Sequence, residues 1–162
     1  MFKSHYGETI TVVLSIVMGF IMAFAVIAVD HLQLNFSNVF QIWAMVTLVI
    51  LLVSIVIPYK AWSARFTALF HLAEGSIAYR LVDNILPSLI LNTFNTMIVS
   101  ATSIFFNEAI PASEQAGVWL HGIIRDWPIT FVISYFAAFA AEAAGKMVAK
   151  HFCSSLAKCE TK

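Results

Sequence analysis

The sequence predicts an all-α integral membrane protein in which four transmembrane helices form two parallel helical-hairpin repeats, with a further helix on the cytoplasmic surface. Three observations predict this fold class. The 162 residues are 60% hydrophobic and 11% charged, with a mean hydropathy of +0.87, whereas soluble domains are about 45–50% apolar and 25% charged. The apolar residues gather in long blocks, as membrane spans do. The second half of the chain also aligns with the first. We therefore expect one membrane domain, 1–162.

Four blocks are long enough to cross a membrane as helices. A hydrocarbon core of about 30 Å needs roughly 20 helical residues. Continuous apolar blocks, unlike alternating ones, favour helices over strands, because lipid requires backbones whose polar groups are satisfied internally. The predicted spans are 10–29, 39–59, 86–106 and 127–146. Only the last contains acidic or basic residues, with Glu142 and Lys146 near its end.

The segment between the second and third spans carries apolar residues at helical spacing. These residues are Trp62, Phe66, Leu69, Phe70, Ala73 and Ile77. The spacing predicts an amphipathic helix on the cytoplasmic surface, within a connector that covers 67–85. The alternative is that the second span continues into water as one long helix. Asp83 or Asn84 can cap the third span, with Pro87 in its first turn.

Basic residues predict that both termini are cytoplasmic. Lysine and arginine are more frequent on the cytoplasmic side of membrane proteins, and Arg125 is the only one on the opposite side. The basic residues in the three segments predicted to be cytoplasmic are Lys3, Lys60, Arg65, Arg80, Lys146, Lys150, Lys158 and Lys162.

The two halves of the chain match when the sequence is shifted. An offset of 77 places the first span on the third, and an offset of 84 places the second on the fourth. The matched pairs are Ser15 and Asn92, Gly19 and Thr96, Ala23 and Ser100, and Trp43 and Trp127. The hairpin repeats cover 9–66 and 86–151, and a polar cytoplasmic tail, 152–162, follows. Both copies start on the same side, which predicts an axis along the membrane normal. The alternative to duplication is chance similarity between two apolar hairpins.

Several of these positions also resemble a known family. They are Ser15, Met18, Met22, Trp43, Pro58, Lys60 and Arg65 in the first copy, and Asn92, Trp127, Pro128 and Phe131 in the second. Together they resemble the uncharacterised bacterial two-span membrane family called domain of unknown function 2798, present as a tandem, degenerate pair. The second copy departs from the pattern because no proline matches Pro58. The resemblance implies a multi-pass protein of the bacterial inner membrane, and it transfers no catalytic residue.

A polar stripe in the third span is the strongest candidate for a binding site. It consists of Asn92, Asn95, Thr96 and Ser100. An unsatisfied amide in hydrocarbon costs several kcal/mol, so the stripe must face protein or water. One interpretation is a dry seam, in which the small residues Ser15, Gly19 and Ala23 let the first span approach the third closely. The other is that the stripe lines the path of a small solute.

A second group of polar residues is predicted at the outer rim. Its members include Asp30, His31, Glu108 and His121, together with Arg125 and Asp126. Histidines and carboxylates from both repeats can bind a metal or a cationic ligand where they meet. Their spacing matches no metal-ligand motif, so a solvated rim is the favoured interpretation, and we expect no metal and no cofactor.

The sequence leaves two classes of function open. One is a small-solute transporter or channel, and the other is a non-transporting membrane module that binds a partner protein, a peptide or a lipid. No catalytic motif is present, so an enzyme is not expected. The expected partners are the lipid bilayer and either a second copy of the chain or another membrane protein, with no nucleic acid.

Overall fold

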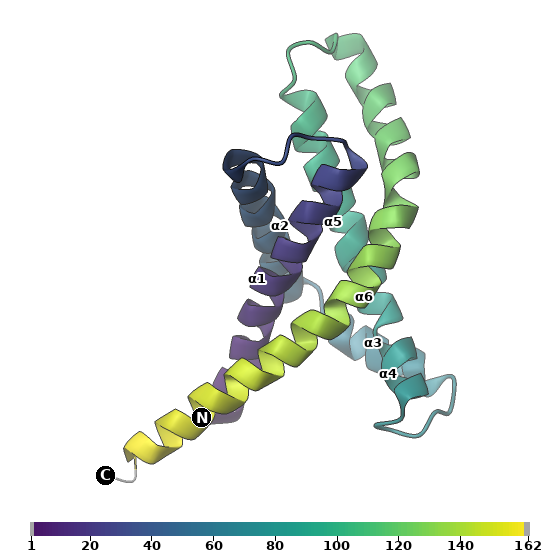
Figure 1. The fold of residues 1–162 in the computed structure, drawn as a ribbon. Coiled ribbons are helices and arrows are strands. Elements are labelled where there is room, and N and C mark those ends of the chain that lie inside the picture. The colour runs from purple at the N-terminus through teal and green to yellow at the C-terminus, as the bar shows by residue number, and fades with distance from the viewer. Residues whose placement is uncertain (1, 161–162) are drawn as a thin grey trace.

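In the computed structural model of the chain, the backbone is described for residues 2–160 and the side chains for Tyr6 and residues 8–151. The described residues form six helices and no strand (Figure 1). The helices are α1 (Phe2–Val29), α2 (Phe36–Val56), α3 (Tyr59–Ala68), α4 (Ile77–Asp83), α5 (Ile85–Phe105) and α6 (Ala112–Glu160). Four stretches are long and apolar enough to cross a membrane, namely Glu8–Val29, Phe36–Val56, Ile77–Phe105 and Ala112–His151. The all-helical fold with four potential spans is thereby confirmed.

The outside of the bundle carries large apolar side chains. Phe36, Ile55 and Phe136 are 84%, 78% and 65% exposed. A water-soluble domain rarely exposes a continuous surface of this kind, whereas hydrocarbon solvates it well. The exposed surface therefore supports a membrane location for the four long stretches.

The second span ends earlier than the sequence predicted, because of a proline. The N–H of Ile57 still donates to the carbonyl of Val53 at 2.8 Å, but α2 ends at Val56. Pro58 has no N–H with which to continue the helix, and α3 begins directly after it. The predicted span 39–59 was therefore wrong at its end, and the alternative of one uninterrupted helix is wrong as well.

The predicted amphipathic helix is only partly formed. α3 ends at Ala68, and residues 69–76 form turns in which His71 and Gly75 have φ angles of 51° and 82°. Such left-handed residues interrupt a helix. The continuous stripe predicted from position 62 to 77 was therefore wrong beyond Ala68.

α3 turns its small polar residues toward the protein. Ser63 and Thr67 are buried, while Trp62 and Leu69 are 46% and 73% exposed. Ser63 Oγ donates to Asp83 Oδ1 at 2.7 Å, which fixes α3 against the end of α4. Trp62 and Leu69 thus face away from the protein, whereas Tyr59 at the start of α3 is buried.

Asn84 precedes α5 at the predicted capping position but does not cap it. Its side-chain Nδ2 donates to the carbonyl of Tyr135 in α6, at 2.9 Å. Pro87 lies in the first turn, where a missing N–H removes no helical hydrogen bond. The expected cap is therefore replaced by a contact between two spans.

α6 is much longer than the predicted span 127–146. Its 49 residues extend over about 74 Å at 1.5 Å per residue, more than twice the hydrocarbon thickness of about 30 Å. Most of the segment between the predicted third and fourth spans is helical, because α6 starts at Ala112. The predicted tail, 152–162, continues the helix as far as Glu160, and its side chains and residues 161–162 lie outside the described part.

Pro128 lies inside α6, and the helix changes direction along its length (Figure 1). Proline is the usual cause of such a bend, because it removes a helical hydrogen bond. Below the bend, α6 crosses α1 (Figure 1). The same helix therefore packs against α5 with its first half and against α1 with its second.

The small residues of α1 pack against α2. A Cβ atom added at Gly19 would lie 2.2 Å from Thr47 Oγ1. The Thr47 hydroxyl donates to the carbonyl of Ser15 at 3.4 Å, and Ala23 is fully buried. α1 packs chiefly against α2 and α6, and α5 chiefly against α6. The prediction that these small residues pack the first span against the third was therefore wrong, because their neighbour is α2.

A second small-residue stripe lies on α6. Ala137, Ala141, Gly145 and Ala149 follow one another at four-residue spacing, and all four are buried. A Cβ atom added at Gly145 would lie 3.2 Å from the carbonyl oxygen of Ile10. This spacing lets helix backbones approach closely in membranes, and here it brings α6 onto α1.

Candidate functional site

The polar stripe of α5 faces α6. Asn92 is fully buried, and its Nδ2 donates to the carbonyl of Trp127 at 3.2 Å. The hydroxyls of Thr96 and Thr130 lie 3.2 Å apart, and Thr130 also donates to the carbonyl of Asp126 at 2.9 Å. The stripe thus joins α5 to the part of α6 that surrounds Pro128.

The two asparagines are incompletely hydrogen-bonded. Asn92 Oδ1 and both amide atoms of Asn95 are buried without a hydrogen-bond partner, and Asn95 is 3% exposed. A buried polar group without a partner costs about 1–3 kcal/mol. Asn95 is therefore the residue of the stripe whose presence packing explains least.

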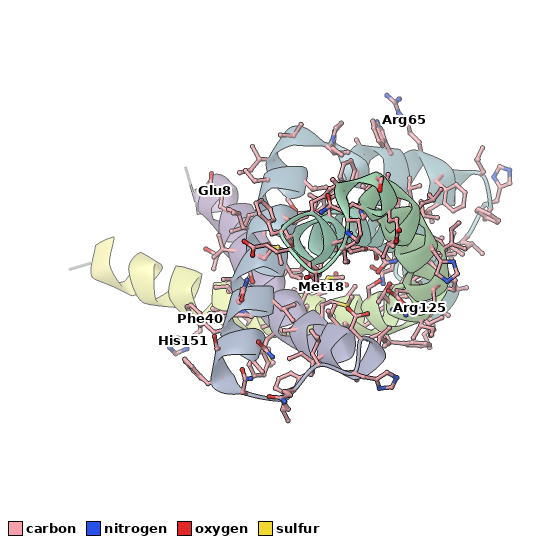
Figure 2. All side chains as sticks on the ribbon, turned by 90° about the horizontal axis from the view of Figure 1, so that it is seen from above. Glu8, Met18, Phe40, Arg65, Arg125 and His151 are labelled. Carbon is pink, nitrogen blue, oxygen red and sulfur yellow. The ribbon has the colours of Figure 1, made fainter. Side chains whose placement is uncertain are left out.

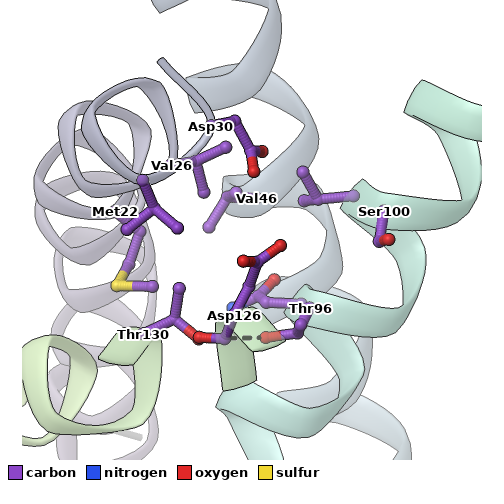
Figure 3. Close-up of a pocket in the computed structure, with 11 residues that line it drawn as sticks. Met22, Val26, Asp30, Val46, Thr96, Ser100, Asp126 and Thr130 are labelled. Carbon is purple, nitrogen blue, oxygen red and sulfur yellow. Dashed lines mark hydrogen bonds between the residues drawn. The ribbon is translucent and has the colours of Figure 1, made fainter. Parts of the chain in front are cut away.

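Asn95 lines a small cavity, which we call the Asp30 cavity (Figure 3). Its polar lining residues are Asp30, Asn95, Thr96, Ser100, Asp126 and Thr130. Met22 and Val26 of α1 form part of the apolar wall. The cavity volume is about 30 Å³, which is room for about two water molecules. In this state a larger solute does not fit beside Asn95.

An ion-paired cluster lies at the Asp30 end of this cavity. Arg125 Nη2 lies 3.1 Å from Asp30 Oδ1, and Arg125 Nε lies 2.6 Å from Asp126 Oδ1. The guanidinium of Arg125 thus forms ion pairs with two carboxylates, one from each hairpin. Burial raises the pKa of Asp30, and repulsion from Asp126 raises it further, while Arg125 and His31 oppose the shift.

The other predicted rim residues do not join this cluster. His31, Glu108 and His121 are exposed, and none of them lines the Asp30 cavity. Among the described residues, no three or more histidine, cysteine or acidic side chains come together in a way that could hold a metal ion. Asp126 lines the cavity, although the sequence indicated only a rim position for it.

A larger cavity lies toward the opposite end of the bundle, and we call it the Ser88 vestibule. Its volume is about 520 Å³, within the range of about 300–1,000 Å³ that is typical of ligand sites. Residues of α1, α3, α4, α5 and α6 line it. The charged residues in its lining are Lys60, Arg80, Asp83, Glu142 and Lys146. The sequence pattern did not predict this cavity, because its walls come from five separate segments.

The two cavities are about one helical turn apart. Met22 and Asn95 line the Asp30 cavity, whereas Met18 and Leu91, each four residues earlier, line the Ser88 vestibule. Met18 is fully buried near the centre of the bundle (Figure 2). Together with Asn92, it occupies the level between the two cavities.

Comparisons with family models, with curated proteins and with solved structures found no match to this chain.

Proposed function

We propose that the protein is a small membrane transporter that passes a small uncharged or weakly polar solute along the polar stripe of α5. The observation that carries this proposal is Asn95, whose buried amide has no partner and faces a cavity. An amide in this position can donate to and accept from a solute. A stripe with a purely structural role would be expected to satisfy its own polar atoms.

The sizes of the cavities support a state that is open toward the Ser88 vestibule. A solute in the vestibule is separated from Asn95 by about one turn, at Met18 and Asn92. At the opposite end, the ion pair between Arg125 and Asp30 links α6 to the end of α1. In our proposal the transport cycle widens the Asp30 cavity by separating these two segments.

We also propose that the two hairpins are repeats of one unit. The indole of Trp43 donates to the carbonyl of Ile16 at 3.0 Å, and the indole of Trp127 donates to the hydroxyl of Thr93 at 3.0 Å. The two tryptophans are matched at an offset of 84, and Ile16 and Thr93 are matched at the offset of 77. The recurrence of this contact at matched positions supports duplication over chance similarity.

In our proposal both termini are cytoplasmic, as the basic residues predict. The membrane is the bacterial inner membrane, as the resemblance to the two-span family implies. Lys60, Arg80 and Lys146 line the same vestibule, while Arg125 lies at the Asp30 cavity with its two carboxylates. This separation of basic residues supports placing the vestibule on the cytoplasmic side.

A membrane module that binds a ligand without moving it is the second candidate function. The observation that favours it is the contrast in volume, about 520 Å³ for the vestibule against about 30 Å³ for the Asp30 cavity. Such a module would hold its ligand in the vestibule and keep Asn95 away from water. The accessibility of Asn95 therefore separates the two functions.

Cysteine labelling tests the proposal. In a background with Cys153 and Cys159 changed to serine, we would treat Asn95→Cys in intact membranes with a small charged thiol reagent. The matched control is Ile98→Cys. Ile98 lies less than one turn from Asn95 on the outer face of α5, and its side chain is 37% exposed. A thiol in hydrocarbon stays protonated and unreactive, so only a position that water reaches is labelled quickly.

We expect Asn95→Cys to be labelled at least about tenfold faster than Ile98→Cys, because opening of the bundle exposes position 95 to water. Glycerol serves as an uncharged probe, because proteoliposomes swell as it enters them. Asn95→Leu should slow this swelling. Labelling of position 95 no faster than that of position 98 would overturn transport and leave the binding module.

A further inference from the structure

We propose that the Ser88 vestibule binds the phosphate headgroup of an anionic phospholipid and holds part of an acyl chain against its apolar wall. This inference gives a ligand class to the second candidate function. Its test counts bound lipid directly, so its outcome is distinct from that of the labelling test at Asn95, which lines the other cavity.

The vestibule is amphipathic along its length. Ile10, Leu14 and Met18 of α1 line it together with Leu91 of α5, and these side chains form an apolar wall. The charged lining residues come from α3, α4 and the end of α6 that lies beyond the bend. A ligand that fits both parts has a charged group joined to a hydrocarbon chain.

The charge of the vestibule favours an anion. Glu142 already pairs with Lys146, at 2.5 Å. Asp83 Oδ1 accepts hydrogen bonds from Ser63 at 2.7 Å and from Thr67 at 3.3 Å.

Lys60 and Arg80 also line the vestibule, and within the described part of the chain neither forms an ion pair with an acidic residue. Two cations are therefore available to an incoming anion. Basic pockets between spans at the cytoplasmic side of a membrane favour anionic headgroups.

Ser88 provides a second, independent indication of a ligand. Its hydroxyl is buried without a hydrogen-bond partner, the residue is 1% exposed, and it lines the vestibule. A serine inside a helix commonly donates to the carbonyl one turn earlier, as Ser15 does to Thr11 at 2.8 Å. Ser88 makes no such bond, so its hydroxyl is free to donate to a phosphate oxygen.

The surroundings of the vestibule favour a lipid over a soluble phosphate compound. α3, which contributes Lys60 and Ser63 to the lining, exposes Trp62, and Phe70 just beyond its end is also exposed. Exposed aromatic residues of this kind are enriched at the level of lipid headgroups. The charged part of the vestibule would then lie at headgroup depth, with its apolar wall toward the acyl chains.

The test compares two lipids with the same acyl chains. The purified full-length chain in neutral detergent would be titrated with phosphatidylglycerol or with phosphatidylcholine, and bound lipid would be counted by native mass spectrometry. Both lipids carry a phosphate, but only phosphatidylcholine adds a cationic choline, which Lys60 and Arg80 repel. We therefore expect phosphatidylglycerol, which has a net negative charge, to bind at least about tenfold more tightly. Equal binding of the two lipids would overturn the proposal.

Two double variants separate a site from general surface charge. Lys60→Gln with Arg80→Gln removes the unpaired cations of the vestibule. Arg65→Gln with Lys150→Gln removes the same charge from exposed positions outside it, and Arg65 points away from the bundle (Figure 2). The first pair should weaken phosphatidylglycerol binding about tenfold, and the second should leave it unchanged. Equal losses would overturn the vestibule as the site.

Ser88→Ala and a soluble competitor complete the test. Ser88→Ala should weaken phosphatidylglycerol binding about tenfold, as expected for one hydrogen bond to a charged phosphate oxygen. Without lipid, this variant should unfold at the same temperature as the parent or higher, because it removes an unsatisfied hydroxyl. Glycerol 3-phosphate at millimolar concentration should not displace the lipid. Displacement would identify a soluble phosphate compound as the ligand and overturn the lipid assignment.

Discussion

The two helical hairpins are held together by different chemistry, although a tryptophan indole donates a hydrogen bond across each of them. In the α1–α2 hairpin, Gly19 lies directly against Thr47, and an apolar core surrounds this contact. In the α5–α6 hairpin, the corresponding level is polar. There Asn92 donates to the carbonyl of Trp127, and the hydroxyls of Thr96 and Thr130 meet.

In our proposal, this difference separates a scaffold hairpin from a functional hairpin. Close packing of small and apolar side chains in α1–α2 gives a rigid support and presents few groups that could bind a ligand. Among the described side chains, the buried polar atoms without a hydrogen-bond partner all lie on α5, at Ser88, Asn92 and Asn95. We therefore regard α1–α2 as the scaffold and α5–α6 as the functional hairpin.

Gly19→Leu should break the scaffold and have the largest effect. Even a single Cβ atom at this position would lie 3.2 Å from the backbone nitrogen of Thr47 and 3.3 Å from its Cα, as well as 2.2 Å from its hydroxyl. Backbone cannot move aside as a flexible side chain can, so the two helices must separate. We expect a loss of about 3 kcal/mol or more, measured as a large fall in the thermal unfolding temperature in detergent.

Ala28→Leu is the control for that substitution. Ala28 lies on the same helix but is exposed, so a larger apolar side chain there meets solvent or lipid. We expect little change in the unfolding temperature. Similar shifts for the two variants would contradict the assignment of Gly19 to a close helix contact.

Substitutions of the two asparagines should have opposite effects on stability. Asn92→Leu removes the hydrogen bond to the carbonyl of Trp127 together with one unpartnered atom, Oδ1, and should lower the stability by up to about 1 kcal/mol. Asn95→Leu removes two unpartnered amide atoms without breaking a hydrogen bond. It should therefore leave the stability unchanged or raise it by about 1 kcal/mol.

Thermal unfolding of the two asparagine variants in the same detergent measures this contrast. Residues that lower stability are expected mainly at functional sites, so this contrast would support the proposed role of Asn95. Equal destabilisation by both substitutions would instead make Asn95 part of the packing between hairpins.

The sequence predicted the number and approximate positions of the spans, because long uncharged blocks depend only on composition. It also predicted the polar stripe, since asparagine is conspicuous in an apolar block. It did not predict which helices would meet. The stripe of Ser15, Gly19 and Ala23 indicates that a close neighbour exists, but small residues do not specify whether that neighbour is α2 or α5.

Two further features were missed for different reasons. One is the packing face of α6, which the sequence could have predicted because its small residues have the same four-residue spacing. These residues are Ala137, Ala141, Gly145 and Ala149. The other is the Ser88 vestibule, which could not be predicted from the sequence. Ser88 and Lys60 come together only through the turn at Pro58 and the placement of α3 and α4. Local spacing identifies faces of helices, whereas cavities depend on how those faces are assembled.

The link between the hairpins at Asp30 should give the smallest effect, and it should depend on pH. Burial and then Asp126 raise the pKa of Asp30 above its ordinary value of 3.8, against the opposing influence of Arg125 and His31. A raised pKa in the folded state means that ionisation of Asp30 opposes folding. The stability that the protonated group contributes is therefore present below pH 3.8 and is lost as the pH rises through the raised value.

Asp30→Asn isolates this contribution, because an asparagine does not ionise at any of these pH values. We would measure unfolding temperatures of the parent and the variant in detergent just below pH 3.8 and at pH 8, since the difference between the two proteins cancels titrating groups that do not interact with Asp30. The variant should gain stability relative to the parent between the lower and the higher pH, even though it gives up the ion pair with Arg125. A loss over the same interval would mean that the ion pair outweighs burial and the repulsion from Asp126. The bond between Asp30 and Arg125 would then be a fixed link between the hairpins, and opening at this end would need a different cause.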